Sequence, residues 1–125
     1  MNKIENENLK DVGILLPENP QVLAVFNYLQ TKGQMAGVRY SENQRVHEAL
    51  DFSGNIPNIM PYHSSKGLQF ETVFMPFCGS NITGIFWRNP FYVALTRTVK
   101  TLIITYTGLP SSFFHEIDRT LYQII

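Results

Sequence analysis

The chain has 125 residues, of which 44% are hydrophobic, so it can bury the core of one domain without disulfides or a metal. Its ten basic and ten acidic side chains give a formal net charge of zero. This balance excludes a general electrostatic attraction to nucleic acid, so any such contact must be local. Cys78 is the one cysteine, which excludes an intrachain disulfide, fits a reducing compartment and leads us to expect a cytoplasmic protein.

The first predicted elements follow a polar segment. Residues 1–10 offer nothing to bury, so we expect a flexible N-terminal segment there and a single domain over residues 11–125. No apolar run approaches the roughly 20 residues that span a bilayer, so we expect no membrane contact. Residues 12–16 predict a buried strand. A helix is predicted over residues 21–32, because its apolar residues form one stripe and Gly33 follows as a stop.

The next segments are predicted as a strand, a short helix and a strand. Residues 36–40 are typical of a strand, and Ser41 or Asn43 is suited to cap a short helix that carries Val46 and Leu50. Residues 56–62 resemble a strand but contain two prolines, which remove backbone donors. They therefore indicate an edge strand, a bulge or a short strand.

The second half of the chain predicts two further strands, each followed by a turn or helix. The strands are expected at residues 72–77 and 101–106, with a helix opening at Asn89-Pro90 between them. A last helix is expected from Ser111 or Ser112 onward, carrying Phe113, Phe114 and Ile117. Strands that alternate with helices predict an α/β fold, with a mostly parallel sheet covered on both faces.

Two polar turns interrupt these apolar runs. Because ligands of an open α/β sheet bind at the carboxyl ends of its strands, we expect both turns near that edge of the sheet. The first is His63-Ser64-Ser65-Lys66-Gly67-Leu68-Gln69-Phe70, and the second is Phe91-Tyr92-Val93-Ala94-Leu95-Thr96-Arg97. In this order they resemble motif V (Thr-x-His-x-x-Lys-Gly-Leu-Glu-Phe) and motif VI (Tyr-Val-Ala-Leu-Thr-Arg) of UvrD/Rep-type superfamily 1 DNA helicases. The resemblance covers most of the chain from about Asp11 onward. It implies a RecA-like domain, namely the C-terminal portion of the second motor domain of an ATP-dependent DNA helicase.

The resemblance implies contacts between the first turn and single-stranded DNA. The residues concerned are His63, Ser64, Ser65 and Lys66. A lysine and hydroxyl groups suit phosphodiester contacts, which give affinity without base specificity. The threonine that the family has two positions before the histidine is here Pro61, which lacks both the hydroxyl and a backbone donor.

The resemblance also implies nucleotide contacts. Gly67 and Gln69 would lie near the nucleotide, with Gln69 facing the ribose, and Arg97 would be the catalytic residue at the γ-phosphate. A guanidinium fits that role because it stays charged and makes bidentate bonds to phosphate oxygens. The family has glutamate where this chain has Gln69, whose amide still forms hydrogen bonds but without the strength of a charged partner.

The chain lacks the other half of an ATP site. It contains no Gly-x-x-x-x-Gly-Lys-Ser/Thr loop of its own and no Asp-Glu pair at the end of a strand to hold Mg²⁺, and we expect no metal site. We therefore expect the fragment alone to bind no cofactor. ATP and Mg²⁺ would act in the full-length parent, where the N-terminal RecA-like domain is the partner across the cleft.

Alternative interpretations remain open at this point. The chain can be a degenerate, non-catalytic RecA-like module that binds protein or DNA, or an isolated nucleotide-binding domain of another α/β family. Arg97 can instead bind the carbonyls at the end of its own helix. We favour packing over base stacking for Trp87, structural roles for His47 and His115, and a surface position for Glu71.

Overall fold

The computed structural model describes residues 10–116. In chain order, the elements are β1 (Val12–Leu16), α2 (Asn19–Thr31), β2 (Gly37–Glu42), β3 (Arg45–Ala49), β4 (Asn58–Pro61), the 3-10 helix η1 (Tyr62–Ser65), β5 (Phe70–Met75), α3 (Ile85–Leu95), β6 (Thr98–Ile104) and the 3-10 helix η2 (Ser112–Glu116). The segment predicted to be flexible, apart from its last residue, and Ile117 of the predicted last helix lie outside the described residues.

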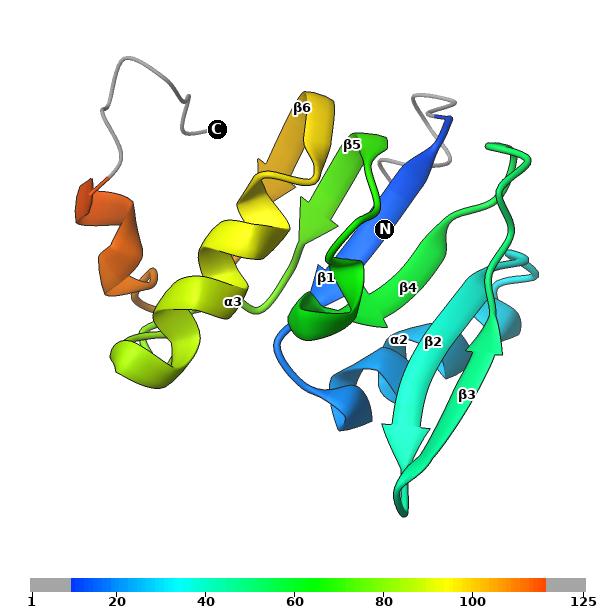
Figure 1. Cartoon of the computed structure of the whole chain (residues 1–125), viewed down its shortest axis with the longest axis horizontal. Coiled ribbons are helices and arrows are strands. Elements are labelled where there is room, and N and C mark those ends of the chain that lie inside the picture. The colour runs from blue at the N-terminus through cyan, green and yellow to red at the C-terminus, as the bar shows by residue number, and fades with distance from the viewer. Residues whose placement is uncertain (1–9, 117–125) are drawn as a thin grey trace.

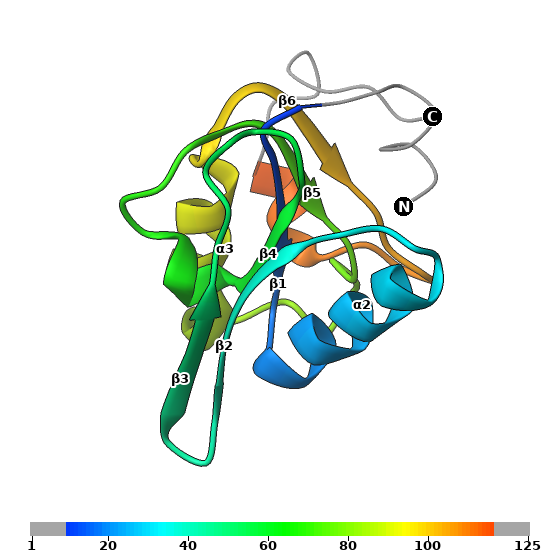
Figure 2. The same cartoon turned by 90° about the vertical axis from the view of Figure 1, so that its right-hand side faces the viewer.

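The six strands form one sheet in the order β3-β2-β4-β1-β5-β6. All neighbouring strands are parallel except β2 and β3, which are antiparallel. Helix α2 covers one face, and α3 lies on the other with the two 3-10 helices (Figures 1 and 2). The prediction of an α/β fold with a mostly parallel sheet and helices on both faces is confirmed.

The central strand β1 supplies both cores. All five of its residues are buried, as expected for a parallel strand covered on both faces. Because side chains alternate along a strand, Ile14 and Leu16 pack in the cluster under α2, whereas Leu15 packs in the cluster under α3.

Helix α2 begins and ends close to the predicted positions. The Glu18 N–H donates to Gln21 Oε1 over 3.1 Å, which satisfies a donor at the N-terminus of the helix. At the other end Gly33 adopts a left-handed φ of 75° and its N–H donates to the Gln30 carbonyl. The apolar stripe buries Val22 and Leu29 against the sheet.

The prediction of a short helix after Ser41 is wrong, because this segment forms the turn and the second strand of a hairpin. Asn43 and Gln44 adopt φ values of 52° and 64°, the paired left-handed geometry of a two-residue hairpin turn. β3 then pairs with β2, and the Tyr40 and His47 rings stack 4.7 Å apart. Val46 is 62% exposed, so it does not form the buried face that a helix would need.

β4 is an interior strand rather than an edge strand. It lies between β2 and β1, and all four of its residues are buried. Pro57 precedes the strand and Pro61 is its last residue, so neither proline occupies the middle of the ladder. Of the predicted alternatives, the short strand is confirmed and the edge position is wrong.

The remaining elements are shifted along the chain from their predicted positions. α3 begins at Ile85, four residues before Asn89, and Pro90 lies inside the helix. β5 and β6 each begin a few residues earlier than predicted. The last helix is a short 3-10 turn in the described residues, and its buried Phe113 packs on Phe91, with ring centroids 5.2 Å apart.

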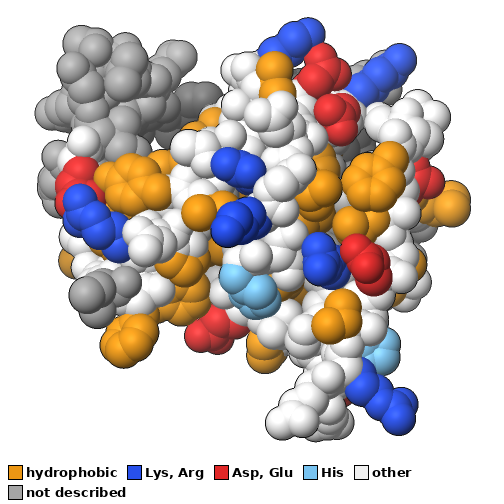
Figure 3. All heavy atoms as spheres, in the orientation of Figure 1, with side chains coloured by type: hydrophobic (Ala, Val, Ile, Leu, Met, Phe, Trp, Pro, Cys, Tyr) orange, Lys and Arg blue, Asp and Glu red, His pale blue; other side chains and the backbone are white. Residues whose placement is uncertain are grey.

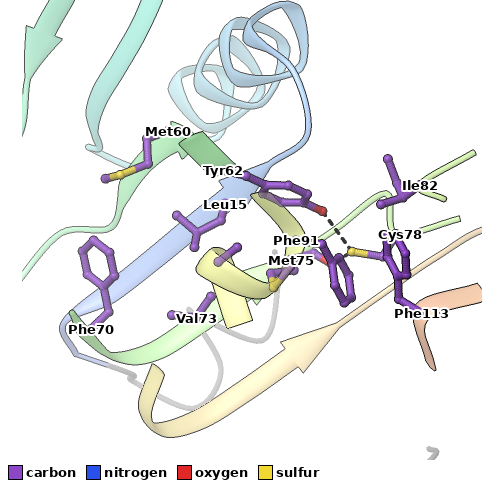
Figure 4. Packing of buried hydrophobic residues seen from close by; sticks show 11 residues of the cluster. Leu15, Met60, Tyr62, Phe70, Val73, Met75, Cys78, Ile82, Phe91 and Phe113 are labelled. Atoms are coloured by element: carbon purple, nitrogen blue, oxygen red, sulfur yellow. Dashed lines mark hydrogen bonds between the residues drawn. The ribbon is translucent and has the colours of Figure 1, made fainter. Parts of the chain in front are cut away.

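The cluster under α3 contains a buried polar pair (Figure 4). The Tyr62 hydroxyl and the Cys78 Sγ are 3.2 Å apart, and Cys78 Sγ also donates to the Met75 carbonyl over 3.3 Å. Both side chains are fully buried. Burial raises the pKa of the Cys78 thiol to about 11 and is also the main cause of the raised pKa of Tyr62.

The buried thiol predicts a loss of stability in alkali. The Cys78 pKa is about 11 in the folded protein against 9.0 for a free thiol, so the folded state binds the proton more tightly. Its contribution to the free energy of unfolding, about 3 kcal/mol, is therefore complete below pH 9 and is lost as pH rises toward 11. Urea titrations at several pH values should show this decline, and Cys78→Ala should make it shallower. An equally steep decline in Cys78→Ala would contradict the assignment.

Candidate functional site

The first polar turn is built on β4 and η1. Pro61 ends the strand, and Tyr62 is buried beneath the turn. The Ser65 hydroxyl donates to the Tyr62 carbonyl over 2.7 Å, and the Leu68 N–H donates to the Ser65 carbonyl over 3.0 Å. These bonds fix a tight turn that leaves His63 exposed.

The residues of this turn do not all reach the surface. Lys66 is exposed and Ser64 is half-buried, so both present side chains beside His63. Ser65, in contrast, is fully buried and its hydroxyl is used inside the turn. Of the four residues predicted to contact DNA, Ser65 is therefore the one whose hydroxyl points into the turn and not to the surface.

The turn opens onto a pocket of about 370 Å³ that the hairpin completes. The residues around this pocket are Arg39, Ser41, Val46, His63, Ser64 and Lys66. Figure 3 shows Lys, Arg and His side chains gathered over the middle of this face. None of the three hairpin residues was predicted from the sequence. Ser41 and Val46 were assigned to a helix, and Arg39 was assigned to a strand with no role in a site. The strand register between β2 and β3 is the signal that would have placed them.

The segment after this turn crosses the face of the sheet. Pro61 is level with Leu16 at the carboxyl end of β1, whereas Phe70 lies two residues before the level of Val12 at the amino end. The segment between them therefore runs back roughly 20 Å along the sheet. Gly67, with a φ of 85°, allows the reversal and is exposed.

We had expected both motifs at the carboxyl edge of the sheet. Because of this crossing, they do not share that edge. Gln69 precedes β5 and Arg97 precedes β6, so both lie at the amino ends of their strands. The Phe70 N–H donates to the Arg97 carbonyl over 2.8 Å, which joins the two motifs through the backbone. Of the three residues predicted at the nucleotide, Gln69 and Arg97 thus lie at the same edge of the sheet, opposite the edge at which β4 leads into the turn beside the pocket.

The Arg97 side chain lies against the end of its own helix. Its Nε donates to the Val93 carbonyl over 2.9 Å, and Nη2 donates to Thr96 Oγ1 over 2.8 Å. This is the helix-end alternative that the sequence left open. Nη1 makes no hydrogen bond to the described part of the chain, so the guanidinium keeps donors for a further partner.

Three other residues near the motifs form contacts within the protein. The half-buried Trp87 meets the Tyr62 ring edge-on, with centroids 6.2 Å apart, which confirms packing. Arg88 pairs with Glu116 over 2.6 Å. Glu71 pairs with Lys100 over 2.8 Å, in keeping with the predicted surface position.

Two kinds of feature are absent from residues 10–116. Within that range no group of three or more His, Cys, Asp or Glu side chains is placed to hold a metal ion. None of the helices there has the length and apolar character needed to cross a membrane.

Comparison with known proteins agrees with the fold. A family model described as the UvrD-like helicase C-terminal domain matches residues 34–108, and no curated protein matches. A similar solved structure is the C-terminal domain of a possible DNA helicase from Lactobacillus plantarum WCFS1. It has a TM-score of 0.73 and 19% identity, over 97% of this chain and 70% of that chain. Because the family model matches more than half of the sequence, the chain belongs to the UvrD-like helicase C-terminal domain family.

Proposed function

We propose that this chain is the part of an ATP-dependent DNA helicase that couples ATP hydrolysis to movement along single-stranded DNA. One observation carries the proposal. A single segment, residues 62–69, runs from a cationic pocket at one end of the sheet to the backbone contact with Arg97 at the other. One continuous segment therefore joins a surface suited to DNA phosphates with an arginine suited to a nucleotide phosphate.

On the DNA side, the proposal assigns phosphate contacts to His63, Ser64 and Lys66. Their side chains reach the surface and line one pocket, and none of the residues around that pocket is acidic. Ser65 acts by holding the turn that presents them. Contacts of this kind bind the strand without reading its sequence, as a translocating protein requires.

On the nucleotide side, the proposal assigns the ribose to Gln69 near Gly67, and the γ-phosphate to Arg97. Both glutamine and arginine lie at the same sheet edge, and the guanidinium retains an amino group for a phosphate. The chain has no phosphate-binding loop. ATP and Mg²⁺ would therefore be held largely by an N-terminal RecA-like domain of the parent protein, with this chain completing the site.

The proposal also implies where such a protein works. One unpaired, buried cysteine fits the reducing cytoplasm. DNA repair is the pathway that the family suggests.

Loss of Lys66 tests the DNA side. Lys66→Gln should weaken binding of this chain to a fluorescently labelled oligo(dT) about 3- to 10-fold. It should also reduce the slope of log K against log salt by about 0.7, since one phosphate contact is lost. Fluorescence anisotropy over a salt series measures both quantities.

The matched control is Lys32→Gln. Lys32 follows α2 on the opposite face of the sheet, where its ammonium lies 5.7 Å from the centre of the Tyr28 ring. The same change in net charge there should leave affinity and slope unchanged. Equal effects of the two substitutions would mean that the chain attracts DNA only through its overall charge, and the assigned site would be wrong.

A non-catalytic module is the second candidate function. It is favoured by the hydrogen bonds of Arg97 to its own helix end and by Pro61 and Gln69 at motif positions. A parent protein without ATPase activity would support this candidate.

A further inference from the structure

We propose that the β2–β3 hairpin forms a second wall of the single-stranded DNA site, in which Arg39 binds a backbone phosphate next to the one held by the Lys66 turn. We also propose that Glu48 restrains this arginine. The inference rests on the proposed function, since it extends the same DNA path, but it concerns residues outside both motifs.

The hairpin register places the relevant side chains on one face. Arg39 pairs with Glu48, and Ser41 pairs with Val46. Since paired residues share a face and neighbours alternate, these four side chains point the same way, and Tyr40 points to the other face, where it packs in the cluster under α2. The hairpin thus turns one set of side chains toward η1.

Arg39 bridges the hairpin and the motif V turn. Its Nη1 lies 3.4 Å from the Ser64 carbonyl oxygen, and its Nε lies 3.6 Å from Glu48 Oε1. Its side chain is 35% exposed, and it lines the pocket together with His63 and Lys66. Two elements that are far apart in the sequence therefore contribute cationic groups to one hollow.

The contacts of Arg39 position its guanidinium and leave N–H donors for a phosphate. Both distances are long for charge-assisted bonds, which are usually about 2.7–2.9 Å. A planar guanidinium presents five N–H donors in a fork that matches phosphate oxygens. Ser41 and Ser64, which carry hydroxyl groups, line the same pocket, and Val46 adds an apolar residue suited to a sugar. These lining side chains together favour binding of a flexible phosphodiester chain.

Glu48 should oppose DNA binding. Its side chain is 51% exposed, lies beside Arg39 and does not line the pocket. It therefore lowers the positive potential of the pocket and competes with a phosphate for the guanidinium. Removing its charge should tighten binding, which is the opposite of the effect of removing the charge of Arg39.

The test compares variants of this chain by anisotropy with labelled oligo(dT) and oligo(dA) over a salt series. Arg39→Gln should weaken binding about 3- to 10-fold on both oligonucleotides and lower the salt slope by about 0.7. Arg39→Lys, which keeps the charge, should keep most of the slope. Glu48→Gln should strengthen binding about 2- to 3-fold, and Lys32→Gln should behave like the wild type.

The slope of log K against log salt distinguishes two roles of Arg39, namely binding a phosphate and shaping the motif V turn. Glutamine retains donors for the Ser64 carbonyl, so a purely positioning role would leave both affinity and slope of Arg39→Gln close to those of the wild type. An unchanged slope in Arg39→Gln, with Lys66→Gln still defective, would overturn this inference and leave the proposed function standing. Wild-type chain that fails to bind either oligonucleotide would overturn both.

Discussion

Arg97→Ala in the full-length parent should reduce ATP hydrolysis stimulated by single-stranded DNA about a thousandfold or more, with folding and DNA binding intact. An arginine that stabilises the charge on a transferring phosphoryl group contributes 10³–10⁵ to turnover. Its contacts to Val93 and Thr96 are exchanged for water, and a charge at a helix end is worth only about 0.3–1 kcal/mol of stability. Steady-state ATPase assays at saturating oligonucleotide measure the effect, with melting temperature and anisotropy as checks.

Arg88→Ala is the matched control for this experiment. Arg88 lies on the same helix, and its ion pair with Glu116 is exposed, so its loss should change turnover little. Arg97→Lys should also be strongly impaired, since an ammonium lacks the bidentate fork. A parent with no ATPase activity, or an Arg97→Ala variant as active as the wild type, would refute the catalytic assignment and favour the binding module.

Gly37→Ala should lower the free energy of unfolding by about 3 kcal/mol or more. A Cβ atom at this position would collide with Asn58 Oδ1, and it would lie 2.9 Å from the Asp51 nitrogen and 3.0 Å from the Ala49 oxygen. Asn58 is buried and forms two bonds with the Asp51 backbone, at 2.8 Å and 2.6 Å. The collision would break this pair and leave buried polar atoms unsatisfied. Urea denaturation gives the difference.

A double-mutant cycle checks the cause of this loss. Asn58→Ala removes the atom that the new methyl group would strike. The double variant should therefore lose less stability than the sum of the single variants, by about 1 kcal/mol or more. Additive losses would show that the collision with Asn58 is not the reason. The strand β2 that Gly37 begins also carries Arg39, so Gly37→Ala should weaken DNA binding as well.

The parallel core was predictable because its signals are local. Buried strands such as β1 are continuous apolar runs, and α2 carries a clear apolar stripe with Gly33 after it. The β2–β3 hairpin was not predictable in the same way. Val46, Ala49 and Leu50 have helical spacing, and Asn43-Gln44 lacks the glycine that usually marks a two-residue turn. This segment forms a strand because it pairs with β2, and that pairing cannot be read from the sequence.

The two motifs of the site were predictable, but their arrangement in space was not. The sequence singled out Lys66 and Arg97, yet it placed both turns at one edge of the sheet. The strand register separates them, since the segment from Pro61 to Phe70 runs from the carboxyl ends of the strands back to their amino ends. Arg39 carried no sequence signal, because a single arginine in a strand acquires meaning only from what the fold places beside it.

The burial of Cys78 makes the chain convenient for fluorescence work. A protonated thiol without access to solvent reacts slowly with maleimides, so a single cysteine introduced on the surface would take up nearly all of the dye. Arg45→Cys, on the exposed outer strand of the hairpin, is a suitable position. A dye there would report the approach of an oligonucleotide to the hairpin in real time, with the native cysteine left in place.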